Sequence, residues 1–162
     1  MEQNKNRKKI RLKGANYSDC GAYFITVCTK NKEPLLSDIL LSEAENEPCV
    51  VLKKHGAIAD KIIIQLDHFY ENLSVDQYII MPNHIHLLLL VTESESTKKE
   101  PSEQNTVISK FVSTFKRFCN KKYGMNIWQS RSFDHIIRNK QDYDEHVRYI
   151  LNNPSRWFYR ND

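Results

Sequence analysis

Apolar residues along the chain form short runs of strand length, separated by polar segments. Residues 22–31, AYFITVCTKN, are rich in aromatic and β-branched residues and end in turn formers, which predicts a strand. Residues 73–82, LSVDQYIIMP, and residues 84–92, HIHLLLLVT, predict two further strands. The latter is almost entirely apolar, so we expect it at the centre of a sheet. Residues 130–139, SRSFDHIIRN, predict a short final strand.

Three other segments place apolar residues at the spacing of a helix. In residues 49–70 and 106–123 these positions fall on one helical face. Residues 140–154, KQDYDEHVRYILNNP, predict a third helix. We expect it to end at Pro154, because proline lacks the backbone N–H that would continue the hydrogen bonding.

Two polar segments lack either pattern. Residues 33–48 are acidic and bounded by prolines, which predicts an irregular or partly helical connection. Residues 93–105 are charged and predict a flexible loop. The resulting order, β-α-β-β-α-β-α, predicts an α+β fold of the ferredoxin-like sandwich type. In that fold one antiparallel four-stranded sheet has helices packed on one face, and here an extra C-terminal helix follows.

Composition and charge narrow the class of protein. The chain has 162 residues, a hydrophobic fraction of 40% and a formal net charge of +4, which suits one domain with a real core. We expect residues 1–16 to form a basic N-terminal arm and residues 17–162 to form that domain. The arm lacks the apolar region of a signal peptide, and no segment has the apolar length of a membrane span. The scattered cysteines, without a Cys-x-x-Cys pair, are typical of reduced thiols, so we expect a cytoplasmic protein.

Two histidines stand at the start of the most apolar predicted strand. Side chains two positions apart in a strand point to the same face, so His84 and His86 project together. Two imidazoles on one face can chelate a divalent cation. Partly buried histidines satisfied by hydrogen bonds are nevertheless the commoner explanation for a lone His-x-His pair. The metal interpretation is therefore preferred only if the sequence also offers a third ligand and a reaction that would use the metal.

The last predicted helix has a polar face beside its apolar stripe. Tyr149 lies on the polar face with Asn153 one turn further on, whereas Tyr143 falls in the apolar stripe and is interpreted as core. A tyrosine beside an amide and acidic residues can be reactive. From this helix alone, an ordinary tyrosine at the rim of the core is the commoner explanation, and an asparagine before a proline also fits a helix end.

Taken together, these residues resemble a known family. The segments that carry the resemblance are MPNHIHLLL, the basic helix ISKFVSTFKRFCNKKY and IWQSRSFDHIIRNKQDYDEHVRYILNNP. They are similar to the single-tyrosine HUH transposases, in which U is a hydrophobic residue, here Ile85, and especially to the REP-associated tyrosine transposases. The resemblance runs from the first predicted strand to Pro154. It implies a DNA transposase and endonuclease domain that cleaves and rejoins single-stranded DNA near hairpins.

The resemblance also implies roles for individual residues. His84 and His86 match the metal ligands of the HUH motif, Tyr149 matches the nucleophile, and Asn153 matches the position of the third ligand. A divalent metal, Mg²⁺ or Mn²⁺, would polarise the scissile phosphate, and attack by the tyrosine would give a 5′-phosphotyrosine intermediate. The implied partner is single-stranded or hairpin DNA, bound by a monomer or a homodimer.

Two other functions stay open. One is a hairpin DNA-binding module that lacks cleavage activity, against which the full set of active-site residues argues. The other is an HUH replication or mobilisation nuclease. Many relaxases place the tyrosine before the histidine pair, whereas Tyr149 follows it here, which favours a transposase.

Basic residues gather in two places that suit DNA phosphates. The helix predicted over residues 106–123 has a basic side that no acidic residue interrupts, although such a charge run is most often a solvated face. The N-terminal arm carries a second cluster. The candidate DNA-binding residues are Lys110, Lys116, Arg117, Lys121 and Lys122 in the helix, and Lys8, Lys9 and Arg11 in the arm. The residues given no role in catalysis are Asp134, His135, His55 and His68.

Overall fold

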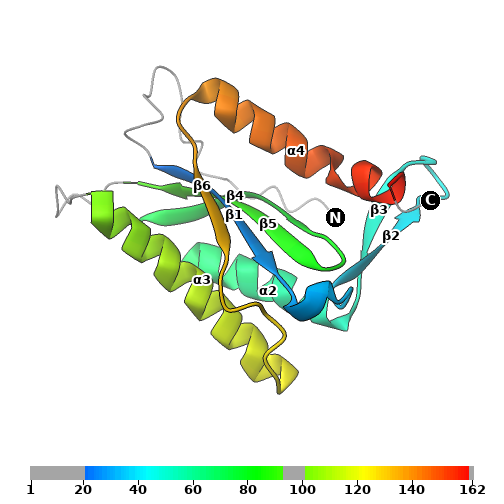
Figure 1. Cartoon of the computed structure of the whole chain (residues 1–162), viewed down its shortest axis with the longest axis horizontal. Helices are drawn as coiled ribbons and strands as arrows, with labels where there is room; N and C mark the ends of the chain where they lie inside the picture. Colours follow the sequence, from blue (N-terminus) through cyan, green and yellow to red (C-terminus); the bar gives the residue numbers. More distant parts are fainter. Residues whose placement is uncertain (1–20, 93–100, 161–162) are drawn as a thin grey trace.

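A four-stranded antiparallel sheet organises the chain. The structure is a computed structural model that describes residues 21–92 and 101–160, with side chains described from residue 107 in the second part. The strands follow the order β4-β5-β1-β6, with antiparallel pairing throughout (Figure 1). Their bounds are β1 Ala22–Cys28, β4 Leu73–Ile80, β5 His84–Val91 and β6 Phe133–Ile136. This order is that of a ferredoxin-like sandwich, so the predicted fold class is confirmed, as is the central place of β5.

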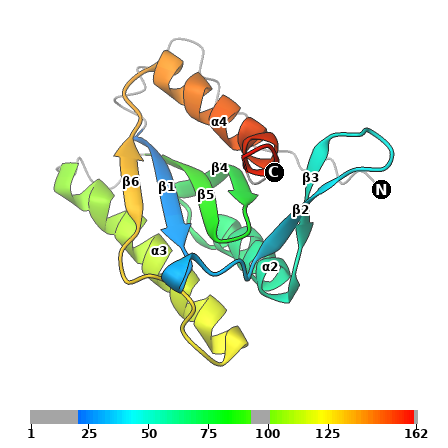
Figure 2. The same ribbon diagram turned by 45° about the vertical axis from the view of Figure 1, so that its right-hand side comes forward.

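Helices cover both faces of the sheet. On one face lie α2 (Lys54–Phe69) and α3 (Pro101–Tyr123), and on the other lies α4 (Lys140–Phe158), as Figures 1 and 2 show. None of the helices in the described part of the chain is long and apolar enough to cross a membrane.

The alternation of side chains along the two inner strands divides the interior into two cores. Ile25 and Leu87 belong to the larger core, which α2 and α3 cover. Phe24 and Leu88 belong to the smaller core, which Ile150 of α4 completes. Positions 84 and 86 are an even number of residues from position 88, so the two histidines share one face of β5, and that face is the one that α4 covers.

Residues 33–52 differ from the prediction. Instead of an irregular connection followed by the start of a helix, they contain β2 (Ser37–Leu41) and β3 (Pro48–Leu52), which pair as a separate two-stranded sheet. A short 3₁₀ turn, η1 (Lys30–Lys32), connects β1 to this hairpin. The hairpin lies beside the C-terminal half of α4 (Figure 2). Pairing between the two strands and packing against α4 stabilise this segment, and neither contact is visible in its local composition.

Two helices are longer than predicted. α4 continues through Pro154 to Phe158, so the expected end at the proline is wrong. Proline removes one intrahelical hydrogen bond, and here Pro154 is buried, so packing offsets that loss. α3 begins at Pro101 rather than after residue 105, because proline is favourable at the first position of a helix. The rest of the predicted loop, residues 93–100, lies outside the described residues.

Candidate active site

The helix α4 positions a tyrosine and an asparagine over the sheet. Asn139 caps the helix by accepting the backbone N–H of Asp142 at 2.8 Å, and Ile150 anchors it in the smaller core. Packing at Ile150 directs the adjacent face of α4 toward the start of β5. Tyr149 is 37% exposed on that face, whereas Asn153, one turn later, is buried.

The two histidines of β5 lie beneath this face. Their ring centroids are 4.5 Å apart, and the ring of His86 lies 5.3 Å from that of Tyr149. Nδ1 of His84 lies 2.7 Å from Oδ1 of Asn83, and Nδ1 of His86 lies 2.9 Å from Oγ1 of Thr26. Each ring is therefore held through Nδ1, which leaves Nε2 for another partner. Nε2 of His86 is buried and has no hydrogen-bond partner among the residues that the structure describes.

Burial also fixes the protonation of both imidazoles. Desolvation, assisted by the positive charge of Lys32, lowers the pKa of His84 to about 4. Desolvation, assisted by repulsion from His84 and His146, lowers the pKa of His86 to about 3. Both rings are neutral at pH 7, so each offers a lone pair on nitrogen.

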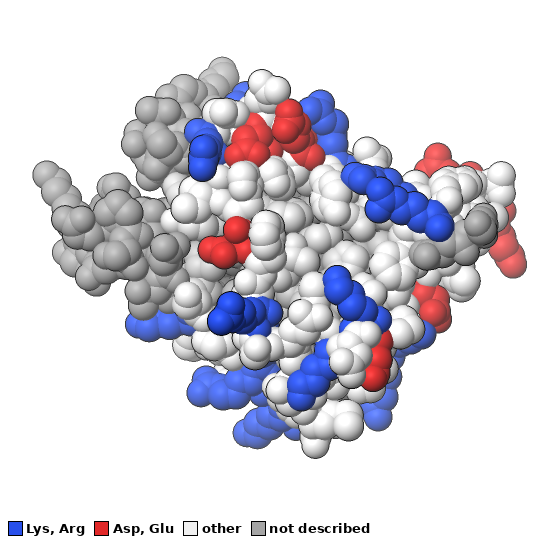
Figure 3. All heavy atoms as spheres, in the orientation of Figure 1, with Lys and Arg blue, Asp and Glu red and all other residues white. Residues whose placement is uncertain are grey.

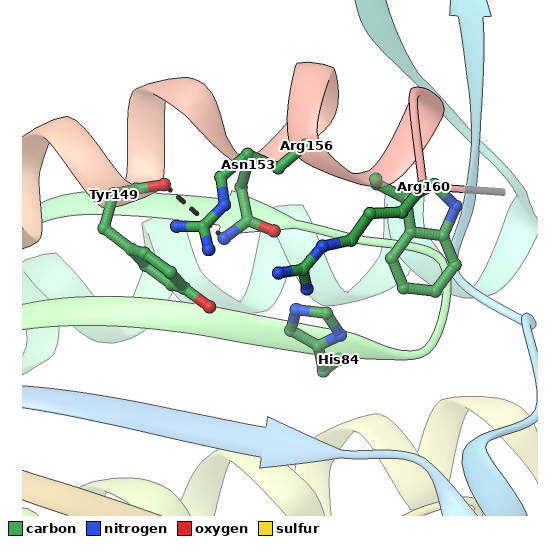
Figure 4. A pocket seen from close by; sticks show the side chains of 6 residues that line it. His84, Tyr149, Asn153, Arg156 and Arg160 are labelled. Atoms are coloured by element: carbon green, nitrogen blue, oxygen red, sulfur yellow. Dashed lines mark hydrogen bonds between the residues drawn. The ribbon is translucent and has the colours of Figure 1, made fainter.

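A pocket of about 290 Å³ opens between α4 and the start of β5 (Figure 4). Figure 4 shows His84 on one wall, with Tyr149 and Asn153 projecting from the helix opposite. The guanidinium carbon of Arg156 lies 5.0 Å from the centre of the Tyr149 ring. The pocket is lined by His84, Tyr149, Asn153, Arg156, Trp157 and Arg160. A phenol, an imidazole and two cations around one cavity suit a phosphate group.

The sequence did not predict the pocket residues that follow Pro154, which are Arg156, Trp157 and Arg160. They were missed because the helix was expected to end at the proline, so no helical face was extended past it. The signal was nevertheless present. Arg156 and Arg160 continue the spacing of Tyr149 and Asn153 by about one turn each, as they would in an uninterrupted helix.

The donor set fits a divalent cation. The unpartnered Nε2 of His86 is the group that a metal would satisfy, and the Nδ1 contacts of both rings are of the kind that orient histidine ligands. Nδ2 of Asn153 donates to the backbone oxygen of Tyr149 at 3.5 Å, which leaves its Oδ1 as the available ligand atom. Two imidazole nitrogens and one amide oxygen suit Mn²⁺ or Mg²⁺.

Comparison with known proteins identifies relatives of this chain. No family model matches the sequence. An uncharacterized protein of Haemophilus influenzae is 29% identical over 94% of this chain and 90% of its own length. A REP-associated tyrosine transposase of Escherichia coli is 28% identical over 85% of this chain and 68% of its own length. This chain is a relative of the REP-associated tyrosine transposases. The resemblance predicted from the motifs is confirmed, and a function of the transposase kind follows from it.

A solved structure of a REP-associated tyrosine transposase bound to a REP hairpin shares the fold. Its TM-score is 0.58 at 24% sequence identity, with 85% of this chain and 68% of that chain covered. The chain therefore shares its overall fold with a known transposase.

In this transposase relative the predicted basic helix lies away from the pocket. α3 covers the sheet face opposite α4, and Lys and Arg side chains gather over it (Figure 3). Its exposed basic residues are Lys110, Arg117, Lys121 and Lys122. Lys116 differs, because its ammonium donates to the backbone oxygens of Gln129 at 2.9 Å and Ser130 at 3.4 Å. Lys8, Lys9 and Arg11 lie outside the described residues.

Proposed function

We propose that this protein is a metal-dependent, single-tyrosine transposase that cleaves and rejoins single-stranded DNA near hairpins. The observation that supports this most strongly is the convergence of Tyr149, His84, Asn153 and two arginines on one pocket. Homology with the REP-associated tyrosine transposases supports the reaction class. The REP hairpin bound by the structural relative supports a DNA hairpin as the partner.

Tyr149 is the proposed nucleophile. Its Oη attacks the scissile phosphorus, the bond from phosphorus to O3′ breaks, and the phenol loses its proton while the leaving oxygen gains one. The products are a 5′-phosphotyrosine and a free 3′-hydroxyl. A 3′-hydroxyl of this or another strand reverses the step and reseals DNA. Since the phosphoester is conserved in the protein–DNA link, no nucleotide cofactor is needed.

His84, His86 and Asn153 are the proposed metal ligands. A cation held by these residues would supply Lewis acidity to the scissile phosphate. The chain itself prepares the ligands, because Asn83 and Thr26 fix the imidazole orientations. The lowered pKa values of both histidines mean that no proton has to be displaced from either ring near pH 7.

Arg156 and Arg160 are the proposed phosphate-binding residues. Both side chains are exposed and line the pocket beside Tyr149 and His84. Guanidinium groups bind phosphate oxygens with paired hydrogen bonds, and fixed positive charge stabilises the negative charge that builds up on those oxygens during transfer. Trp157 lines the same pocket, where its ring offers a surface for stacking a base.

Covalent trapping tests the proposal. The protein is incubated with a single-stranded hairpin DNA and Mn²⁺ or Mg²⁺, and adducts are resolved on a denaturing gel. We expect an adduct that requires the metal and disappears in Tyr149→Phe and in His84→Ala/His86→Ala. Tyr159→Phe is the matched control, because Tyr159 is an exposed tyrosine of the same region that does not line the pocket.

The outcomes separate the competing functions. An adduct that persists in Tyr149→Phe would exclude this nucleophile. Metal-independent hairpin binding without an adduct, tested over a panel of hairpins, would instead favour the DNA-binding module. A circular dichroism spectrum of each variant establishes that the fold is retained.

A further inference from the structure

A second group of metal-ligating side chains lies outside the candidate active site. His135 of β6 and two residues of the first turns of α4, Asp142 and His146, place their ligand atoms within 4.8 Å of one another. Nε2 of His135 lies 3.0 Å from Oδ2 and 3.1 Å from Oδ1 of Asp142. Nδ1 of His146 lies 3.1 Å from Oδ1 of the same carboxylate. None of the three lines the pocket of Tyr149.

The carboxylate at the centre of the group is held in place by the backbone. The N–H of Arg138 donates to Oδ2 of Asp142 at 3.0 Å, and the N–H of Asp142 itself donates to the capping side chain of Asn139. Partial burial alone would raise the pKa of Asp142. The hydrogen bonds from Arg138 and His135, with the charges of His135 and His146, lower it instead. Asp142 is therefore ionised at neutral pH.

The spacing of the three side chains suits a small coordination sphere. Asp142 and His146 are four residues apart on α4, so both side chains lie on one face of the helix. In a tetrahedral zinc site, ligand atoms about 2.0–2.1 Å from the metal are about 3.3 Å from one another. The contacts to Asp142 are close to that separation. Solvent reaches all three residues, which leaves room for a water ligand.

The same contacts also satisfy the cluster when no metal is bound. Nδ1 of His146 lies 2.8 Å from the backbone oxygen of Asp142. In the tautomer with hydrogen on Nδ1, this N–H donates a hydrogen bond to that oxygen. The rings of His135 and His146 stack with their centroids 4.8 Å apart. Entry of a cation would displace the proton on Nδ1 of His146 and turn hydrogen bonds to the carboxylate into metal–ligand bonds.

We propose that His135, Asp142 and His146 form a second divalent-metal site, separate from the candidate active site and suited to Zn²⁺. Two imidazoles, one carboxylate and an open position are a donor set that zinc commonly takes. A bound ion would tie β6 to the start of α4. His146 also packs on Phe24, with 4.6 Å between ring centroids, and Phe24 in turn contacts the ring of Tyr149 at 6.0 Å. The site would thus stiffen the support of Tyr149.

Zinc titration of the full chain without DNA tests this proposal, so its result does not depend on the proposed cleavage activity. The titration is made by calorimetry in the His84→Ala/His86→Ala variant, which lacks two ligands of the candidate active site. We expect one equivalent of Zn²⁺ to bind. Adding either His135→Gln or His146→Gln should abolish that binding, whereas His68→Gln, an exposed histidine on α2, should leave it unchanged.

Two results would overturn the proposal. One is the absence of zinc binding by His84→Ala/His86→Ala, and the other is binding that survives both His135→Gln and His146→Gln. A measurement on the unsubstituted chain guards against misfolding of a variant. Zn²⁺ should protect His135 and His146 from modification by diethylpyrocarbonate, read by mass spectrometry, while His68 stays reactive. Equal modification of His135 and His146 with and without Zn²⁺ would also contradict the site.

Discussion

Single side chains in the candidate active site combine burial with incomplete hydrogen bonding. His86 is 5% exposed, yet within the described part of the chain its Nε2 has no hydrogen-bond partner. Leaving a buried polar group unpaired costs about 1–3 kcal/mol, so this nitrogen lowers the stability of the metal-free protein. Such a cost is expected where a residue is kept for binding rather than for folding. Arg156 differs, because it is exposed, and its guanidinium lies beside the ring of Tyr149 with its N–H donors directed to no carboxylate of the described residues that would prevent it from binding a phosphate.

The charge of Arg156 gives a prediction about rate. Arg156→Gln should slow formation of the covalent adduct by about 10²-fold, the order seen when one transition-state hydrogen-bond donor is removed. Binding of the hairpin at equilibrium should weaken less than the rate falls, because Arg160 still offers a phosphate contact in the same pocket. The measurement is a single-turnover time course of adduct formation at saturating DNA. Arg148→Gln, at an exposed arginine of the same helix that does not line the pocket, should react at the unaltered rate. Equal rates for both variants would contradict the role of Arg156.

Cys119 and Tyr123 give a prediction about alkaline pH. Burial raises the pKa of the Cys119 thiol to about 12, and burial, with the neighbouring Cys119, raises the pKa of Tyr123. In the unfolded chain the thiol loses its proton near the ordinary cysteine pKa of 9.0, while the folded chain keeps it. The unfolded state then binds fewer protons, so the free energy of unfolding should fall as the pH rises from about 9 toward 12.

Urea unfolding between pH 8 and pH 11 measures this effect. Cys119→Ala should have a lower stability at pH 8, because a buried group is lost, but a shallower decline with pH. Cys49→Ala, at a half-buried cysteine in β3, serves as the control and should keep the full decline. A decline of the same steepness in Cys119→Ala would show that other groups cause it.

At the scale of elements, α4 depends on contacts with distant strands. Its N-terminal half contributes Tyr143, whose hydroxyl donates to the carboxylate of Asp76 in β4. Tyr143 also packs against the smaller core, which agrees with its interpretation as a core residue. The C-terminal half of α4 lies beside the hairpin of β2 and β3. Apolar packing and the hydrogen bond from Tyr143 to Asp76 therefore help to fix the helix along its length.

Removing the Tyr143 hydroxyl tests this anchor. Tyr143→Phe should lower the free energy of unfolding by about 1–3 kcal/mol, because hydrogen bonds to charged groups are stronger than neutral ones. In an Asp76→Ala background the same substitution should have a much smaller effect, since the acceptor is already absent. Urea denaturation of the unsubstituted chain, Tyr143→Phe, Asp76→Ala and the double variant gives the coupling energy between the two side chains. Equal losses in both backgrounds would show that the hydroxyl contributes by another contact.

Much of this arrangement could be predicted from the sequence, and the exceptions have physical causes. Runs of apolar, aromatic and β-branched residues locate the four strands of the main sheet, although β5 is apolar on both faces and β6 is largely exposed. The helical period separates Tyr149, on the polar face of α4, from Tyr143 in its apolar stripe. The hairpin was missed because its strands are short and partly exposed, so pairing rather than pattern determines them. The pocket arginines were missed because local rules end a helix at a proline, whereas burial of Pro154 allows α4 to continue.

At the scale of the whole molecule, the sheet separates two positively charged regions. The pocket with Arg156 and Arg160 lies on the α4 side, and the exposed basic residues of α3 lie on the opposite side. We propose that α3 contacts DNA outside the cleavage point, such as the hairpin stem. A DNA substrate would then contact both regions only if it extended past the edge of the sheet, from the pocket beside α4 to the basic residues of α3.

Substitutions on α3 should therefore affect binding but not chemistry. Lys121→Gln/Lys122→Gln should weaken hairpin binding and reduce the slope of log affinity against log salt by about 1.4–1.8, for two phosphate contacts. The rate of adduct formation at saturating DNA should not change. Fluorescence anisotropy at several salt concentrations gives the slope. Lys61→Gln on α2 is the control, as an exposed lysine of the neighbouring helix. An unchanged slope would show that Lys121 and Lys122 do not contact the phosphates of the hairpin stem.

The packing of α4 against the sheet limits how DNA strands could be exchanged at Tyr149. Lifting the helix would expose Phe24 and Leu88, which are buried beneath it, and would break the hydrogen bond between Tyr143 and Asp76. Under the proposed function, a DNA end joined to Tyr149 is therefore tethered to a stationary point. The travelling partner is the DNA, whose free 3′ end must be brought to the pocket. The length of single-stranded DNA between a hairpin and its cleavage point then limits how far the free 3′ end can reach, and so determines which DNA ends can be joined.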